Sequence, residues 1–311
     1  MKKIFMMMAT AIILASCSQT ELEESFVGQK EIKFSNLNDK VTRAANDAKA
    51  NYKIYAAWTN GTNWFINDEV DGLTNLPAND PYHWPAAGTV SFYSWAPATV
   101  TATTDTYPDL SITYTVPSAA NEDFTIATPK TGMSAASNPN IVALEFAHML
   151  AKISVTASLH QDLIDAGYTL STTGLTAELV VQLTGGTVNP INSPAVWTSP
   201  NGTGATYTGV SSYMVMPQTS TGCTVQVTAG IEIKDNGGNV IYTGNLAKYT
   251  IMAGNVPNDN FDMGKHYLLN LTISETSTGG GGENIFNVIE FSADVADWDT
   301  PTGTDTPLPQ P

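Results

Sequence analysis

The sequence predicts an all-β protein built from β-sandwiches. Short segments of alternating apolar and polar residues recur along the chain, and glycine, proline and asparagine separate them. Charged residues make up only 14% of the chain, well below the usual quarter. Threonine, serine, asparagine and glycine supply the polar surface instead. Threonine favours strands and the other three favour turns, so composition and pattern point to the same fold class.

The predicted strands are short and begin near residue 31. They cover Glu31–Ser35, Tyr52–Trp58, Thr89–Trp95, Leu110–Val116, Phe124–Thr128, Leu175–Leu183, Tyr213–Met216, Thr224–Ala229, Ile231–Lys234 and Asn239–Tyr242. The last two flank Asp235–Gly238, whose residues predict a hairpin turn. Residues His160–Ala166 predict a single helical turn. The apolar residues of Ile141–Val155 fit a helical stripe and a strand face equally well, so periodicity leaves this segment open.

The N-terminus predicts export and lipidation. Lys2 and Lys3 precede an apolar run that is shorter than the roughly 20 residues needed to span a bilayer. The run ends in Leu-Ala-Ser-Cys, which resembles the bacterial lipobox, so we expect residues 1–16 to be a signal peptide and Cys17 to carry palmitate. Residues 17–29 would tether the fold. Their glutamates resemble the surface-export signal of Bacteroidota lipoproteins and predict an exposed position on the cell outer membrane.

With Cys17 lipidated, Cys223 has no disulfide partner, because the chain has only 2 cysteines. Its alternating surroundings predict a small buried core residue. The net charge of −16 disfavours nucleic acid as a partner.

No pattern in the sequence predicts catalysis or a cofactor. The 4 histidines lack metal-ligand spacing, and no nucleophile elbow or phosphate-binding glycine loop occurs. His148 lies in an apolar run and predicts a packing histidine. Asp259 and Asp262 flank Phe261 and could help to bind calcium, but a solvated loop is the favoured interpretation. Four tryptophans could form a sugar-stacking surface, although core packing is favoured; they are Trp58, Trp64, Trp84 and Trp95.

The chain divides into two halves of ordinary domain size. We expect an N-terminal β-sandwich over residues 30–140, which ends in the polar segment Ser134–Asn140, and a C-terminal β-sandwich over residues 141–276. Residues 277–311 begin with a glycine hinge that includes Gly279–Gly282. An amphipathic strand, Asn287–Trp298, follows it, and the tail from Thr300 is rich in proline and threonine and predicts disorder.

The order of several segments resembles a known family. These segments are the lipobox with Cys17, Glu31–Phe34, Thr42–Ala44, Tyr82–Pro85 with Val90–Tyr93 and Pro97, Leu144–Ile153, Gly264–Tyr267 and Val295–Trp298. In this order they resemble the fimbrillin-like lipoproteins of Bacteroides and Porphyromonas relatives, which are type V pilins, the major and minor fimbrial subunits. The resemblance covers nearly the whole chain.

This resemblance implies tandem β-sandwich domains of transthyretin-like topology, with Leu144–Val155 as a strand. It also implies a structural pilus (fimbrium) subunit that supports cell adhesion. An arginine-specific protease would cut after Arg43 and leave Ala44 as the first residue, removing the lipid and the strand that contains Ile32 and Phe34. Arg43 is the only arginine in the chain. A strand from a neighbouring subunit, of the same or a related kind, would then fill the gap by donor-strand exchange.

The amphipathic C-terminal strand is a candidate for the donor. Ile289, Phe291, Ala293 and Val295 alternate with polar or small residues, and the glycine hinge would let the strand swing out. The same strand could instead complete its own domain, and both alternatives stay open. The alternative function is that of a permanently anchored surface lipoprotein, or a tip or anchor adhesin, that binds a host glycan or protein.

Overall fold

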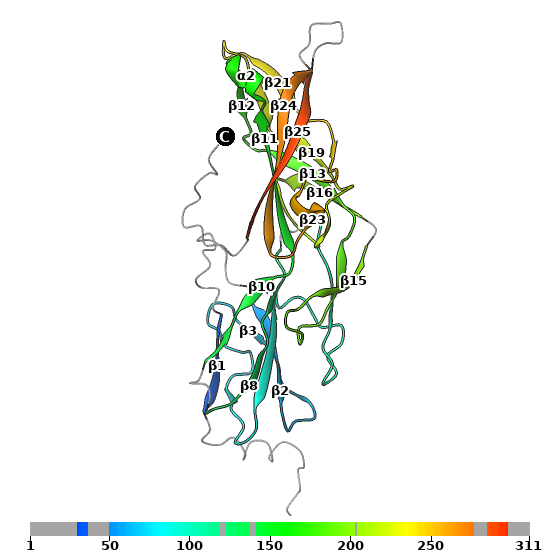
Figure 1. The fold of residues 1–311 in the computed structure, drawn as a ribbon. Coiled ribbons are helices and arrows are strands. Elements are labelled where there is room, and N and C mark those ends of the chain that lie inside the picture. The colour runs from blue at the N-terminus through cyan, green and yellow to red at the C-terminus, as the bar shows by residue number, and fades with distance from the viewer. Residues whose placement is uncertain are drawn as a thin grey trace, which may run out of the picture.

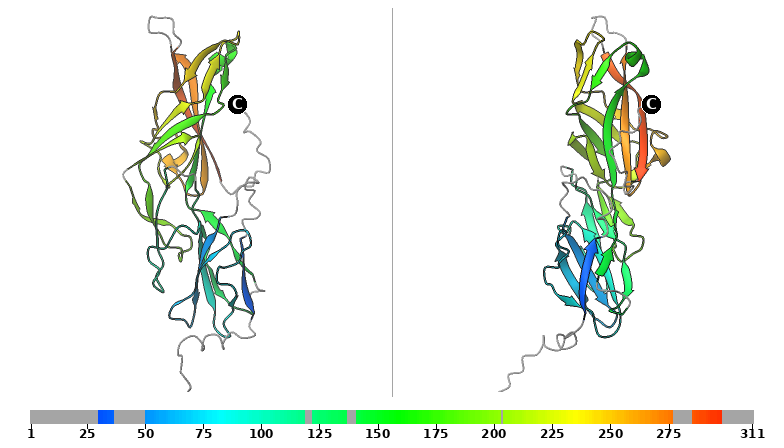
Figure 2. Two further views of the ribbon diagram at one scale, coloured as in Figure 1. Left: turned by 180° about the vertical axis from the view of Figure 1, so that it is seen from behind. Right: turned by 90° about the vertical axis from the view of Figure 1, so that its left-hand side faces the viewer.

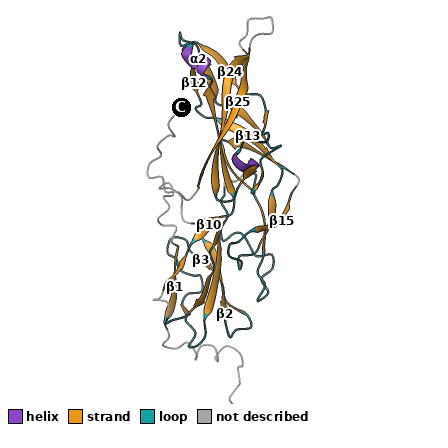
Figure 3. Cartoon of the chain, in the orientation of Figure 1, coloured by secondary structure: helices purple, strands orange, loops and turns teal. Residues whose placement is uncertain are grey.

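The structure, a computed structural model, describes residues 30–36, 50–118, 122–136, 141–202, 204–276 and 285–297. Strands predominate in this part of the chain, and helices are confined to short turns (Figure 3). The predicted all-β class is therefore confirmed. The molecule is elongated, with strands from the first half of the chain at one end and strands from the second half at the other (Figure 1).

Strands near the N-terminus form two sheets around one core. The strands are β1 (Glu31–Asn36), β2 (Tyr52–Trp58), β3 (Trp64–Val70), β4 (Tyr82–His83), β5 (Val90–Ala96), β7 (Thr125–Ala127), β8 (Lys130–Met133), β9 (Ile141–Leu144) and β10 (Phe146–His148). One sheet has the order β10-β7-β5-β2-β3, with β8 also paired to β5, and the other has the order β4-β1-β9. Their apolar faces meet in a core that joins residues of β1 and β9 to residues of β2, β3 and β5.

Three more sheets and a short ladder follow in the second half. Their strands are β11 (Ala151–Leu159), β12 (Thr169–Ser171), β13 (Thr176–Val181), β16 (Ala205–Val210), β17 (Ser212–Val215), β18 (Gln218–Thr219), β19 (Thr224–Ala229), β20 (Ile231–Lys234), β21 (Val240–Gly244), β22 (Tyr249–Thr250), β23 (Asn260–Phe261), β24 (Lys265–Thr276) and β25 (Ile285–Asp297). The sheets have the orders β17-β11-β24-β25, β16-β13-β19-β22 and β12-β20-β21, and β18 pairs with β23. The helical turns are α2 (Gln161–Asp165) and η2 (Pro257–Asp259).

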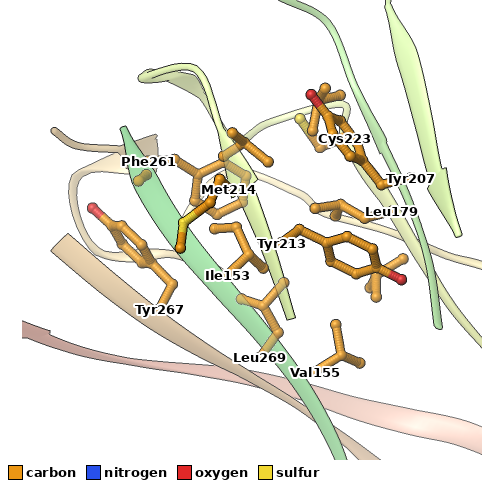
Figure 4. Close-up of a cluster of buried hydrophobic side chains, with 14 of the residues drawn as sticks. Ile153, Val155, Leu179, Tyr207, Tyr213, Met214, Cys223, Phe261, Tyr267 and Leu269 are labelled. Atoms are coloured by element: carbon orange, nitrogen blue, oxygen red, sulfur yellow. The ribbon is translucent and has the colours of Figure 1, made fainter. Parts of the chain in front are cut away.

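Alternation along β11 explains how the C-terminal core forms. Every second residue from Ala151 to Leu159 is buried, and the residues between them are half-buried. Ile153 and Val155 therefore meet side chains from the facing sheet, such as Leu179 and Tyr207 (Figure 4).

A small sheet links the two halves of the chain. β6 (Ile112–Thr115) pairs with β14 (Gly185–Val188), which also pairs with β15 (Trp197–Asn201). In addition, β9 pairs with β1 and β10 pairs with β7. Residues 141–148 therefore associate with N-terminal strands, although they follow the domain boundary that we expected at residue 140. The division into tandem domains stays a prediction.

Several local predictions are confirmed. β2 and β19 have the expected bounds, and β20 and β21 form the expected hairpin. In its turn, the Asp235 side chain accepts hydrogen bonds from the backbone N–H groups of Gly237 and Asn239. The helical turn after His160 is α2. The ambiguous segment from Ile141 is extended, as the family resemblance implied, but it is divided into β9, β10 and β11 where the chain passes between the two groups of sheets.

Candidate functional site

β1 lies in the middle of its sheet, between two strands from later parts of the chain. On one side, Glu31 and Ile32 pair antiparallel with His83 and Tyr82 of β4. On the other side, residues Lys33–Asn36 pair in parallel with β9. The side view in Figure 2 shows this strand, in dark blue, facing the viewer. Because β4 and β9 both bond to β1, neither edge facing it would have a partner if β1 were absent.

The apolar residues of β1 close the N-terminal core. Ile32 is 0% exposed and Phe34 is 5% exposed. The Phe34 ring meets the Phe92 ring edge to face at a centroid distance of 5.9 Å, and Trp84 packs against the same Phe92 ring at 5.8 Å. Burial of side chains of this size contributes about 1.5–3 kcal/mol each. Lys33, between them, points outward, and its ammonium group lies 3.4 Å from Glu31 Oε2.

Strand β4, which pairs with one edge of β1, is also held in place by contacts that do not involve β1. Asp68, 6% exposed, accepts hydrogen bonds from the Tyr82 hydroxyl at 3.1 Å and from the Asn79 backbone N–H at 2.8 Å. Burial, together with the Asp68 carboxylate, raises the pKa of Tyr82 to about 12. β4 is therefore fixed to β3 through side chains as well as to β1 through its backbone.

β25 is an edge strand of its own sheet in this structure. It pairs antiparallel with β24 from Ile285 to Asp297, and Figure 2 shows the two strands side by side. Phe286 is 3% exposed and contacts Tyr242, and Phe291 is 7% exposed and stacks on Tyr249 at a centroid distance of 4.9 Å. An ion pair between Lys265 and Asp297 joins the two strands at the end of β25.

The predicted alternation in β25 is interrupted by a register shift. Thr272 pairs with Glu290 and Ile273 pairs with Val288, so Ile289 is the extra residue of a β-bulge. Of the set that we predicted to share one face, Phe291 is buried, Ala293 is half-buried and Val295 is 38% exposed. The Ile289 side chain lies outside the described residues. Phe286, which we did not predict to be buried, faces the core because the bulge reverses the alternation.

Other predicted site residues lie outside the part of the chain that the structure describes. They include the lipidation residue Cys17 and the cleavage residues Arg43 and Ala44, which lie between β1 and β2 in the sequence. The glycine hinge and the C-terminal tail also lie outside it. These assignments stay predictions.

The tryptophans do not form a shared exposed surface. Trp84 and Trp95 are completely buried, as the core-packing interpretation predicted. Trp58 and Trp64 are half-buried, and their indole N–H groups donate to the backbone oxygens of Ala87 and Asp105. Two of the four rings are therefore inaccessible to a sugar.

Cys223 is a core residue, as we predicted. It is 1% exposed, and burial raises the pKa of its thiol to about 11. A protonated, enclosed thiol is a poor nucleophile at neutral pH.

The other polar candidates have local partners. His148 Nδ1 lies 2.5 Å from an Asp123 carboxylate oxygen, and the Asp259 side chain accepts a hydrogen bond from the Gly254 N–H. Asp262 accepts one from the Tyr267 hydroxyl. Among the described residues, no three His, Cys, Asp or Glu side chains are grouped closely enough to hold a metal ion. The helices in this part of the chain are also too short to cross a membrane.

Comparison with known proteins gives one family. A family model described as fimbrillin-like matches residues 35–298. A candidate cell adhesion protein from Bacteroides uniformis is similar in structure, with a TM-score of 0.56 and 18% identity over 87% of this chain and 99% of its own. A fimbrial protein from Bacteroides vulgatus gives a TM-score of 0.57 and 12% identity over 87% of this chain and 100% of its own. At these identities the similarity shows the fold. No curated protein matches the sequence.

Proposed function

The chain belongs to the fimbrillin-like family, and from this premise we propose that it is a structural subunit of a surface fimbrium that supports adhesion. In this proposal the chain is exported as a lipoprotein, cleaved after Arg43 and polymerised by donor-strand exchange. The observation that carries the proposal is the position of β1, a strand of 6 residues that closes a core between two strands from later in the chain.

Removal of β1 would leave a site that only another strand can fill well. The holes left by Ile32 and Phe34 would expose the side chains that now pack against them, such as Phe92. The backbone groups of β4 and β9 that face β1 would lose their partners. A strand from another subunit restores both the apolar contacts and the backbone hydrogen bonds, which is the energetic basis of strand addition.

The sequence offers one place for an arginine-specific cut. Arg43 is the only arginine and lies between β1 and β2 in the sequence. Cleavage there separates β1, along with any lipid on Cys17, from the remainder of the fold. After this cut, only non-covalent contacts hold β1 in place.

β25 supports the donor role of the C-terminal strand. It has 13 residues, which is more than twice the length of β1, and it lies at the edge of its sheet. As an edge strand it pairs with one neighbour, whereas β1 pairs with two. In the proposed exchange, β25 leaves β24 and gains two neighbours, β4 and β9, in the next subunit.

The lipoprotein part of the proposal places the precursor on the cell outer membrane through Cys17. Metabolic labelling with a palmitate analogue tests it: the precursor should take up the label, and Cys17→Ala should remove it. Labelling that survives this substitution would contradict lipidation at Cys17.

Digestion of the purified precursor with an arginine-specific protease tests the fimbrial function. We expect the cleaved chain to form a ladder of polymers on a native gel. Arg43→Lys keeps the positive charge but removes the cleavage residue, so this variant should remain a monomer. A fully cleaved chain that stays monomeric, alone and with related subunits, would contradict the proposal and favour a permanently anchored adhesin.

A further inference from the structure

Part of the second half of the chain leaves its own sheets and reaches the first half. We call the sheets that contain β1–β5 and β7–β10 the N-terminal group, and the sheets that contain β11–β13 and β16–β25 the C-terminal group. Residues 185–201 comprise β14, β15 and the loop between them, and we call them the arm. The arm follows β13 and precedes β16, but it pairs with β6 instead of with a sheet of the C-terminal group.

Figure 1 shows β15 on one flank of the molecule, at the level where the two groups meet. We propose that the arm holds the two groups in one fixed orientation, so that the chain behaves as one rigid body, and that Trp197 is the side chain that fixes this orientation. The inference concerns a single chain and does not depend on the proposed function.

The pairing of β6 with β14 joins segments that belong to different groups. β6 is connected at both ends to strands of the N-terminal group, β5 and β7, whereas both ends of the arm lead into the C-terminal group. The ladder runs from Ile112 opposite Val188 to Thr115 opposite Gly185, and Ile112 and Val188 are both 0% exposed. The two groups therefore cannot turn relative to each other without disrupting this ladder.

Trp197 contacts three segments of the first half and of the link between the groups. Its ring lies 5.8 Å from the ring of Phe124, the residue just before β7, and 6.4 Å from the ring of Tyr114 in β6. Its indole N–H donates to the carbonyl of Met149 at 2.7 Å. Met149 and Leu150 are the only residues between β10 and β11, so they form the covalent link between the two groups. One side chain of the arm therefore contacts both the link and the segments beside it.

The arm can fix an orientation because its own base is held by the C-terminal group. Gln218, 7% exposed, accepts hydrogen bonds from the backbone N–H groups of Gln182 and Leu183 at 2.8 and 2.9 Å. On the returning side, Gly202 has a φ of +108°, and a Cβ there would overlap the Thr184 side chain. The direction in which the arm leaves its sheet is therefore set by the backbone and by a buried side chain.

Without Trp197, the link would be held by fewer contacts. The Met149 N–H donates to the Phe124 carbonyl at 2.8 Å, and the Leu150 carbonyl accepts from the Gly264 N–H at 2.9 Å. A link of two residues between two packed bodies is the usual position of a hinge. The ring of Trp197 keeps its partners only in one relative orientation of the groups, because those partners come from β6, from the end of β7 and from the link.

Residual dipolar couplings of backbone amides test this inference, because they report whether two parts of a molecule share one orientation. They are measured on the full chain for β2 and β5 of the N-terminal group and for β11 and β24 of the C-terminal group. The test variant is Trp197→Ala, and Trp58→Ala is its control. Trp58 is also half-buried, and its indole N–H also donates to a backbone carbonyl, that of Ala87 at 3.0 Å, but both residues belong to the N-terminal group.

We expect one alignment tensor to fit both groups in the unmodified chain and in Trp58→Ala, and two different tensors to be needed in Trp197→Ala. The Met149 amide and the Val116 amide, which donates to the Thr184 carbonyl at 2.8 Å, should exchange hydrogen roughly tenfold faster in Trp197→Ala. Amides within β2 and β24 should keep their exchange rates.

A single tensor in Trp197→Ala, or two tensors in the unmodified chain, would overturn the inference. If Trp197→Ala does not fold, Trp197→Phe takes its place, because it keeps an aromatic ring and loses only the indole donor. The Met149 amide should then exchange about 2–10-fold faster, while the amides within β2 and β24 stay unchanged. Unchanged exchange of Met149 in that variant would also overturn the inference.

Discussion

At the scale of single residues, Phe34 and Lys33 are neighbours in β1 with opposite environments. Phe34 is 5% exposed and packs against Phe92, whereas the Lys33 side chain is 54% exposed. In the uncleaved chain we expect Phe34→Ala to lower the free energy of unfolding by about 3–5 kcal/mol. Lys33→Ala should change it by less than about 0.5 kcal/mol. Urea denaturation measures both, and equal effects would contradict the described orientation of β1.

We expect the free energy of unfolding to depend on pH through His266, which lies in the same sheet as β25. Burial, and then the nearby Lys152 charge, lower the pKa of His266 to about 4, and its Nε2 lies within hydrogen-bonding distance of Ser154 Oγ, at 2.8 Å. In the unfolded chain the pKa returns to its ordinary value near 6.5. The unfolded state therefore binds more protons between these two values, and the stabilisation is lost as the pH falls through this window.

Between about pH 7 and about pH 5, we expect the free energy of unfolding to fall by on the order of 1–2 kcal/mol because of His266. This figure allows for solvent screening, because His266 is partly exposed. His266→Gln can still form a hydrogen bond with Ser154 but does not titrate, so this variant should lose that part of the pH dependence. The remaining titratable groups act in both proteins and cancel in the comparison. Equal pH dependence in the two proteins, measured by urea denaturation, would show that His266 contributes nothing.

At the scale of elements, the sequence predicted strands where apolar residues alternate without interruption. β1, β2 and β19 were found for this reason, but β3 was missed. Its inward positions include Ile66 and Val70 with Asp68 between them, and a carboxylate interrupts the apolar pattern. Asp68 can be buried there because Asn79 and Tyr82 donate hydrogen bonds to it. Those partners come from a loop and a strand that follow, so the local sequence could not reveal them.

The bulge in β25 was unpredictable for a related reason. Its residues were expected to alternate from Ile289 to Val295, and after the bulge their burial alternates only as far as Ala293. The buried Phe286 lies before it, on the opposite alternation, and only pairing with β24 places both Phe286 and Phe291 against one core. A sequence pattern reports one strand, whereas a bulge belongs to a pair of strands.

Truncation after Ser277 tests how much β25 stabilises the subunit before exchange. The structure shows Phe286 and Phe291 buried in the C-terminal core, so a chain that ends at Ser277 should be destabilised by more than about 3 kcal/mol, the cost of removing a single buried phenylalanine ring. Urea denaturation measures this. Unchanged stability would show that β25 does not contribute to its own sheet in solution.

Polymerisation of the chain truncated after Ser277 tests whether β25 acts as the donor strand. After cleavage at Arg43, the truncated chain should form no ladder on a native gel, because it has an acceptor position but no donor. As a control, addition of a peptide of residues 285–297 should not restore the ladder, since a separate peptide fills acceptors without joining subunits. Normal polymerisation of the truncated chain would rule out β25 as the donor.

At the scale of the whole molecule, the sequence and its family resemblance predicted the fold class and the order of the main segments. They also singled out Ile32 and Phe34, which the structure shows to be core residues of β1. The strand pairing between the two halves of the chain was harder to predict from the sequence. β6 pairs with β14, which also pairs with β15, and β9 pairs with β1, because these distant edges complement each other in space. Such contacts depend on the assembled fold, not on local periodicity.

Amide hydrogen exchange across the assembly cycle tests the central claim most directly. The backbone N–H of Trp84 donates to the Lys30 carbonyl at 2.9 Å, and β9 pairs with β1 along Ile141–Leu144. The Trp84 amide and those β9 amides that face β1 therefore report whether the position of β1 is filled. We expect them to be protected in the precursor, to exchange rapidly in the cleaved monomer after β1 dissociates, and to regain protection in the polymer. Protection that stays unchanged after cleavage and assembly would show that β1 never leaves, and would contradict strand exchange in this protein.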